Sequence, residues 1–161
     1  MNPRLLSEPG LELDVPHFPP SVNKLYTRIR GGGQILSKES RAFAAAFSAY
    51  VMRKYLWEIQ TFKMYHDVSP TAVFMVEYAF FFEESRVLNV TYGSKRGAKT
   101  PYARMDTANY EKLLSDCLAK AIDIDDSRFF SVGTHKHVAK ESPHILIHVK
   151  RRDTSYYGFS R

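Results

Sequence analysis

The alternation of apolar and polar residues along the chain predicts four β-strands. Residues 11–15 (LELDV) alternate apolar and acidic side chains, which indicates a strand with one solvent-facing side. Residues 71–82 (TAVFMVEYAFFF) are apolar at both alternating sets of positions, as in a central strand that is covered on both faces. Residues 128–138 and 144–151 alternate again, and the short segment that joins them predicts a terminal hairpin.

A spacing of three to four residues between apolar positions predicts two helices. The first begins after Ser37, a suitable N-cap, and runs to about Trp57. The second runs from about Thr107 to Ala121. Together these elements give the order β-α-β-α-β-β, so we expect an α/β fold with a single mixed β-sheet and crossover helices.

A chain of 161 residues has the length of one ordinary domain, so residues 1–161 are expected to form a single domain. Three segments are expected to lie outside its regular core. Residues 1–10 predict a loose N-terminal arm, residues 83–104 a basic loop with a local charge of +3, and residues 151–161 a C-terminal tail.

Three consecutive glycines, residues 31–33, predict a flexible hairpin or loop between two apolar flanks. Arg28 and Arg30 are expected at its base. Glycines let a backbone approach a phosphate closely, but the Lys-Ser/Thr pair of a P-loop does not follow here, which disfavours a nucleotide site of that kind.

The charge of the chain narrows the class of partner. The formal net charge is +6 at pH 7 and the pI is about 9.4. A basic protein of this kind favours a polyanion, most often nucleic acid, although an ordinary basic enzyme is the alternative. No apolar run reaches the length of a membrane span, so no membrane partner is expected, and we expect a soluble, cytoplasmic protein.

Two other kinds of site receive little support. The single cysteine, Cys117, excludes an internal disulfide and a thiolate zinc cluster, and its place on an apolar helical stripe predicts a buried thiol. His135 and His137 share one face of a predicted strand, and His144 and His148 share a face of the next. These four could form a zinc site, but an exposed polar face of the hairpin is the favoured interpretation.

One segment reverses the overall charge. Between Met105 and Asp126 there are six acidic residues and two lysines, a local charge of −4. Asp106 can simply cap the second helix, and the aspartates near its end can be turn formers. The alternative is phosphodiester cleavage, in which carboxylates hold Mg²⁺ and a lysine supports the phosphate. The acidic residues are Asp106, Glu111, Asp116, Asp123, Asp125 and Asp126.

Several motifs together resemble the RusA-type Holliday-junction resolvases. The pattern D-x-x-N-x-x-K in DTANYEK is followed by an apolar helix and then by a pair of aspartates. The segment PPSVNKLY is similar to the entry segment of that family, and SKESRAFAAAF to its first helix. FFSVGTHKHV and HILIHVKR are similar to its closing hairpin, including Lys136 in the penultimate strand.

This resemblance implies a homodimeric endonuclease that uses Mg²⁺, with Mn²⁺ as a substitute, to cut two strands of a four-way DNA junction symmetrically. Members of the family usually belong to bacteria or their phages, so the expected location is the cytoplasm of a bacterial or phage-infected cell. Asp106 and Asp126 match the metal-binding aspartates, with Asp125 as a neighbour of the second. Lys112 matches the catalytic lysine and Asn109 the motif asparagine, which we place among the DNA contacts.

The chain departs from the family pattern at one position. The family motif D-x-D-N is here Asp106-Thr107-Ala108-Asn109, so a methyl group stands where the second carboxylate is expected. Either Ala108 is an introduced change that traps a protein–DNA complex, or a natural member has lost or relocated a ligand. With alanine in place of this ligand, we expect the chain to be catalytically impaired. A branched-DNA-binding protein without nuclease activity is therefore the alternative function, and an RNA-binding or non-junction nuclease is a third possibility.

Geometry leaves the composition of the site open. A helix of about 15 residues is roughly 22 Å long, and Asp106 and Asp126 flank such a helix. The site could form where the chain folds back or by pairing across a dimer. Basic residues outside the acidic segment are the expected contacts to the DNA backbone. They are Lys24, Arg28, Arg30, Lys95, Arg96, Lys99, Arg104 and Lys136.

Overall fold

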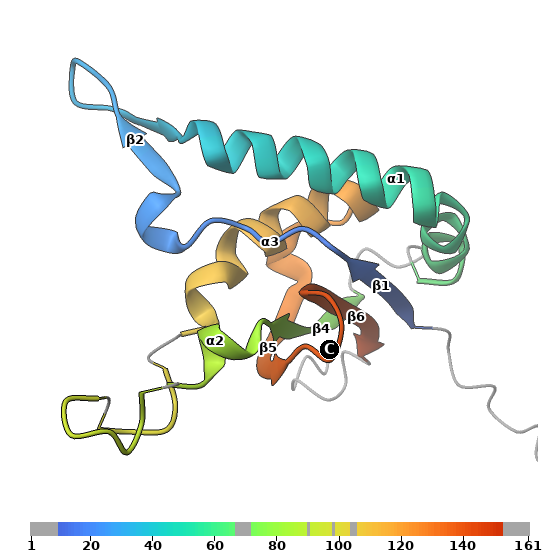
Figure 1. Ribbon diagram of the computed structural model, residues 1–161. Helices are drawn as coiled ribbons and strands as arrows, with labels where there is room; N and C mark the ends of the chain where they lie inside the picture. The colour runs from blue at the N-terminus through green and yellow to red at the C-terminus, as the bar shows by residue number, and fades with distance from the viewer. Residues whose placement is uncertain (1–9, 67–71, 90, 98, 104–105, 153–161) are drawn as a thin grey trace, which may run out of the picture.

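The computed structural model describes residues 10–66, 72–89, 91–97, 99–103 and 106–152. Figure 1 shows the arrangement: two long helices lie on one side of a sheet, and two smaller elements project from the body. The α/β fold class with a mixed sheet, expected from the sequence, is confirmed. The four strands of the main sheet are β1 (Leu11–Val15), β4 (Val73–Phe82), β5 (Phe129–Val138) and β6 (His144–Arg152).

The order of the strands in the main sheet is β1-β6-β4-β5. β4 runs parallel to β5 and antiparallel to β6, and β6 is antiparallel to β1. The predicted terminal hairpin is therefore wrong, because β4 lies between β5 and β6. After β5 the chain crosses the end of β4, where the Ala139 N–H donates to the Phe82 carbonyl over 2.7 Å.

The two long helices are α1 (Lys38–His66) and α3 (Ala108–Ile122). Ser37 is confirmed as a cap of α1, because its Oγ accepts a hydrogen bond of 3.1 Å from the Ser40 N–H. The predicted end of this helix near Trp57 is wrong. Tyr55 has non-helical backbone angles that kink the helix, and a further helical segment continues beyond it.

One face of the sheet forms the core. Alternate residues of β4 from Phe74 to Phe82 are fully buried beneath the helices, and Cys117 of α3 joins this core. The expected buried thiol is confirmed, and its burial raises the pKa of the Cys117 thiol to about 11. Within the core, the Tyr78 hydroxyl lies 2.8 Å from the Ser115 hydroxyl, which in turn donates to the Glu111 carboxylate.

The opposite face of β4 is only half-buried, so the prediction of a strand covered on both faces is wrong. Phe81 lies on this face, and its ring stacks between the rings of His137 and His144 at centroid distances of 4.8 and 4.4 Å. The histidines of β5 and β6 therefore sit on either side of β4. Among the described residues, no group of three or more His, Cys, Asp or Glu side chains could hold a metal ion.

A two-stranded ribbon projects from the start of the chain. It consists of β2 (Tyr26–Arg28) and β3 (Gln34–Leu36), follows the short 3-10 helix η1 (Val22–Lys24), and forms its own antiparallel sheet. The triple-glycine hairpin is thus present, with Arg28 at the base of its turn as predicted, whereas Arg30 does not lie there. Arg28 ends β2 and Arg30 lies in the turn at the tip.

The predicted basic loop contains a short helix, α2 (Glu84–Val87), and the rest of its described part is non-helical. Another 3-10 helix, η2 (Asp126–Arg128), precedes β5. Residues 1–9 of the predicted N-terminal arm and residues 153–161 of the predicted tail lie outside the described residues, whereas the tail's first two residues belong to β6. In the described parts of the chain, no helix has the length and apolar character to span a membrane.

Candidate functional site

The start of α3 is held against the edge strand of the main sheet. The hydroxyls of Thr107 and Thr134 lie 2.8 Å apart, which joins the residue before α3 to β5. The exposed carboxylate of Asp106 accepts a hydrogen bond of 3.0 Å from the Ala108 N–H. This contact is the capping role considered for Asp106. It also fixes the carboxylate at the positive end of the helix dipole.

Lys112 and Asn109 follow within the first turns of α3. The Asn109 N–H donates to the Asp106 carbonyl over 3.2 Å, and the Asn109 side chain is half-buried. Lys112 is exposed and lies four residues after Ala108, so the two positions share a face of the helix. The structure therefore brings the three motif residues Asp106, Asn109 and Lys112 together with the alanine at position 108.

Two further cations lie near the start of α3. The Arg86 guanidinium of α2 donates to the Tyr110 hydroxyl over 3.3 Å and packs over the Phe82 ring at 5.4 Å. Lys136 is exposed and lies two residues beyond Thr134 on the same face of β5. The sequence predicted Arg86 only as part of the basic loop. Its contact with Tyr110 joins two segments 24 residues apart, so no local sequence pattern predicts it.

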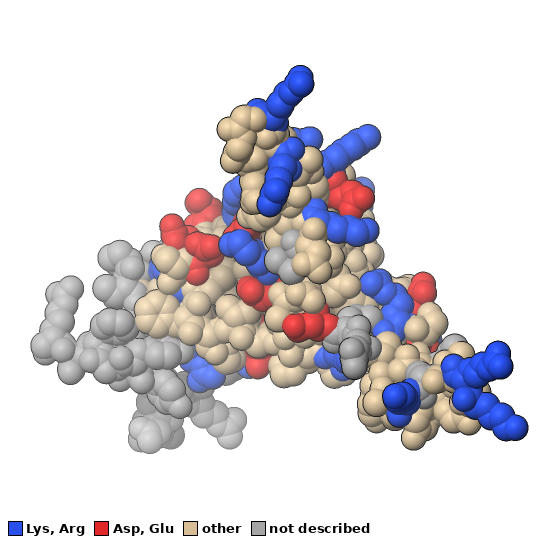
Figure 2. All heavy atoms as spheres, turned by 90° about the vertical axis from the view of Figure 1, so that its left-hand side faces the viewer, with Lys and Arg blue, Asp and Glu red and all other residues tan. Residues whose placement is uncertain are grey.

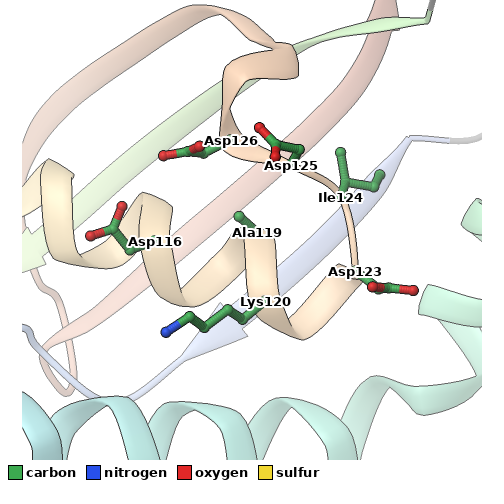
Figure 3. Close-up of a pocket in the computed structure, with 7 residues that line it drawn as sticks. All are labelled: Asp116, Ala119, Lys120, Asp123, Ile124, Asp125 and Asp126. Carbon is green, nitrogen blue, oxygen red and sulfur yellow. The ribbon is translucent and has the colours of Figure 1, made fainter. Parts of the chain in front are cut away.

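The other end of α3 forms an acidic pocket with the turn that follows it. Figure 3 shows Asp125 and Asp126 on that turn and Asp116 on the helix, around the same hollow of about 510 Å³. Asp126 is exposed. Hydrogen bonds from the side chain and backbone N–H of Ser127 hold the pKa of Asp125 below its usual range, so this carboxylate is ionised at neutral pH.

Asp123, on the rim of the acidic pocket, has a structural role. It ends α3 with a left-handed backbone conformation (φ 54°), and its carboxylate pairs with Lys63 of α1 at 2.7 Å. The hydrogen bond and charge of Lys63 lower the pKa of Asp123. The left-handed conformation and the hydrogen bond from the Ile124 N–H to the Ala119 carbonyl (3.0 Å) turn the chain at the end of α3, and the contact with Lys63 joins this turn to α1.

Sequence reasoning had not assigned a role to Asp116. It belonged to the acidic segment, but no motif residue had been matched to it. The available signal was its spacing: it lies four residues after Lys112, which places both on one side of α3. Asp116 is half-buried and lines the pocket together with Asp126. It is therefore a candidate to bind the same cation as Asp126, which its position in the sequence had not indicated.

The carboxylates thus form two groups rather than one. Asp106 lies before α3, whereas Asp116 lies eight residues into the helix, roughly 12 Å along it, and lines one pocket with Asp125 and Asp126. Their oxygens are the donors that Mg²⁺ and Mn²⁺ prefer. However, the described residues of one chain do not bring three such side chains to metal-binding distance of one another. The chemistry of the donors fits a hard divalent cation, and their arrangement within one chain is incomplete.

Two basic projections flank the start of α3. The ribbon carries Arg28 and Arg30, with Lys24 at its foot, and the basic loop carries Lys95, Arg96 and Lys99. Both extend on the same side of the molecule (Figure 1), and Figure 2 shows them as separate clusters of Lys and Arg with acidic side chains on the surface between them. Arg104 lies outside the described residues.

The basic loop has a defined foot. The Asn89 side-chain amide donates to the carbonyls of Thr100 (2.8 Å) and Tyr102 (2.7 Å), and the Ala103 N–H donates to the Val87 carbonyl (2.9 Å). These bonds join the two ends of the loop, so its lysines and arginine are carried on a closed projection. The described residues on it that follow Arg86 include no Asp or Glu.

The sequence matches the model of a known protein family. The family model described as Endodeoxyribonuclease RusA matches residues 16–150, which include both motif-bearing ends of α3, the ribbon and the basic loop. A search of curated proteins gives no match. Members of this family bind branched DNA and are generally dependent on a divalent metal. Because the matched segment covers most of the chain, this protein belongs to the RusA family of endodeoxyribonucleases, the family of Holliday-junction resolvases.

Proposed function

We propose that the protein binds four-way DNA junctions and that its fold is built to cut them by paired, metal-dependent phosphodiester hydrolysis. The observation that carries this proposal is the position of the motif residues at the start of α3 between two basic projections. A backbone that contacts both projections passes over Asp106 and Lys112. Phosphate contacts of this kind select the shape of the DNA rather than its sequence.

The roles of the side chains follow from their chemistry. Asp106 and Asp126, with Asp125 and Asp116 beside the latter, are the residues that would hold Mg²⁺ or Mn²⁺. The bound cation would supply an activated water and neutralise charge at the phosphate. Lys112 is exposed and fixed on the first turns of α3, so it can hold the scissile phosphate and stabilise the charge that develops there.

We further propose that a second copy of the chain completes the site. Asp106 lies before α3, whereas Asp116 and Asp126 line a pocket along its second half, and a two-fold axis can bring this pocket of one chain to the start of the other chain's α3. The same symmetry gives two sites in one dimer, as two symmetric cuts require. The dimer thus accounts for the separation of the carboxylates into two groups and for the two-fold symmetry of a four-way junction. We expect it to act in the cytoplasm of a bacterial or phage-infected cell.

The second candidate is a junction-binding protein without nuclease activity. The observation that favours it is Ala108, which is exposed beside Asp106 and offers no ligand. Three explanations for Ala108 remain: a natural loss of the ligand, an introduced substitution, or a ligand supplied from another position. If Asp116 is the relocated ligand, the chain retains cleavage. If the ligand is simply lost, the chain binds junctions and cuts them very slowly.

The test is cleavage of a synthetic four-way junction whose strands are labelled in turn, with Mg²⁺ or Mn²⁺. Compared with the chain as it stands, Asp126→Asn and Lys112→Ala are expected to lose any symmetric cutting but to keep junction binding in a gel-shift assay. Asp14→Asn is the matched control, because Asp14 is an exposed carboxylate on β1, outside the proposed site. Binding without cutting by every form supports the second candidate. Equal affinity for junction and duplex contradicts both.

A further inference from the structure

The ribbon has two chemically different faces. Its register pairs Thr27 with Ile35, and the Ile29 N–H donates to the Gly33 carbonyl over 3.0 Å, which continues the pairing toward the tip. Directly opposed residues of an antiparallel pair share a face. Ile29, Thr27 and Ile35 therefore form an aliphatic face, whereas Arg28 lies on the other.

The aliphatic face is exposed to solvent, where polar side chains would serve the fold equally well. Ile29 is 45% exposed and Ile35 is 43% exposed, and neither belongs to the hydrophobic core. Ile29 rests on the backbone of Gly33, where a Cβ would lie 3.1 Å from its Cδ1. An isolated two-stranded ribbon is marginally stable in water, so exposed isoleucines on it are more readily explained by a partner than by folding.

The foot of the ribbon is firmly anchored. Leu25 is buried, and its carbonyl accepts hydrogen bonds from the Ser37 N–H (2.8 Å) and the Ser40 hydroxyl (3.0 Å). Ser40 itself is fully buried. The direction of the ribbon relative to α1 is therefore set by the fold. Its tip is adaptable, because Gly31 and Gly32 adopt positive φ angles of 112° and 95°.

The charge around the aliphatic face identifies the class of partner. Residues 16–38 contain no Asp or Glu and carry four cations, Lys24, Arg28, Arg30 and Lys38. A surface that combines this charge with exposed aliphatic side chains suits nucleic acid whose base-pair faces are accessible. In a continuous duplex, stacking hides the faces of the base pairs. At a branch point the terminal base pairs are unstacked, or can be unstacked at a small cost in free energy. Aliphatic side chains that enter base steps in this way are known among DNA-bending proteins.

We propose that the ribbon is a wedge that enters the branch point of a DNA junction. Ile29 and Ile35 pack against the face of a base pair at the crossover, and Arg28 and Arg30 contact the phosphates beside it. The basic loop holds the DNA on the other side of α3. This inference rests on the proposed function, because it takes branched DNA as the substrate and adds the means by which the branch is recognised.

The experiment uses a four-way junction with 2-aminopurine next to the crossover, and a second junction with the same base in the middle of an arm. Fluorescence of 2-aminopurine reports unstacking, and the anisotropy of an end label reports binding separately. The chain as it stands is expected to raise the fluorescence several-fold at the crossover and not in the arm. Ile29→Thr/Ile35→Thr keeps β-branched residues in the ribbon, so its fold is expected to persist.

At saturating protein the double threonine variant is expected to leave the crossover stacked, with a junction Kd weakened by about tenfold, the effect of losing a stacked contact. Leu56→Thr is the matched control, because Leu56 of α1 is also 43% exposed but lies outside the ribbon. Arg28→Gln/Arg30→Gln is expected to weaken binding to junction and duplex alike, with unstacking kept at saturation.

The outcomes separate the two proposals. A double threonine variant that binds and still unstacks the crossover overturns the wedge, as does a chain that binds the junction without any rise in fluorescence. Anisotropy that shows no preference for the junction over duplex overturns the proposed function itself. A circular dichroism spectrum and melting temperature equal to those of the unmodified chain confirm that each variant is folded.

Discussion

Restoring the carboxylate at position 108 is the most direct perturbation of the site. Ala108→Asp places a second carboxylate two residues after Asp106, at the first residue of α3, where the side chain is exposed. An acidic residue in the first turn gains about 0.3–1 kcal/mol from the helix dipole. Repulsion from Asp106 at about 6 Å in water offsets this by about 0.7 kcal/mol. The stability of the variant should therefore differ little from that of the unmodified chain.

The effect on cleavage should be much larger than the effect on stability. A ligand that secures the metal ion contributes several kcal/mol to stabilisation of the transition state. Since each 1.4 kcal/mol is about tenfold in rate, a contribution of roughly 3 kcal/mol gives about a 100-fold faster junction cleavage with Mg²⁺. The assay is single-turnover cleavage of a labelled junction at saturating protein, so that differences in affinity do not enter the rate.

Ala45→Asp is the matched control for added charge, because Ala45 is exposed on α1, outside the proposed site. It should lower DNA affinity slightly and leave the cleavage rate unchanged. The reasoning is refuted if Ala108→Asp folds with an unchanged melting temperature, binds the junction and cuts no faster than the unmodified chain. If both forms then cut, the site is already complete, and Asp116→Asn becomes the decisive variant for a relocated ligand. If neither form cuts, the junction-binding protein without nuclease activity is supported instead.

Two further predictions concern the basic loop and the core. Replacing Lys95, Arg96 and Lys99 by Gln should make the dependence of log affinity on log salt less steep by about 2–3, because each phosphate contact contributes about 0.9 to the slope. An unchanged slope in a salt titration would place the loop away from the DNA. Tyr78→Phe should cost about 1 kcal/mol in urea unfolding, since it deletes one buried hydrogen bond. Ser115→Ala should cost more, because it leaves the buried Tyr78 hydroxyl without this partner, and the reverse order would contradict that account.

The strands could be predicted from the sequence because their signal is local. Alternation with a period of two directly reports which residues face a core, and the predicted boundaries of the four main strands lie within two residues of those observed. The neighbours of each strand are not encoded in this way. β5 and β6 show the same alternation whether they pair with each other or with β4, so the hairpin and the actual order could not be distinguished.

The site was predicted unevenly for a similar reason. The residues at the start of α3 form a compact motif, so Asp106, Asn109 and Lys112 could be identified by their resemblance to the family pattern. The pocket at the other end depends on tertiary contacts. Asp123 pairs with Lys63 across 60 residues, and the turn at Asp123 brings Asp126 into one pocket with Asp116. No pattern within α3 reports this turn, and the partnership of Asp116 was missed.

The division of charge explains why a basic protein carries an acidic segment around α3, a helix whose own two acidic residues are balanced by two lysines. The cations of the ribbon and the basic loop project from the body (Figure 2), whereas most acidic residues of segment 106–126 lie before α3 and on the turn after it. DNA held by the projections is brought close to carboxylates that repel its phosphates. A divalent cation between them removes this repulsion, so DNA and cation each raise the affinity for the other by the same factor. On this account the acidic residues weaken DNA binding until the cation is present, and cleavage is restricted to DNA that the projections have already positioned.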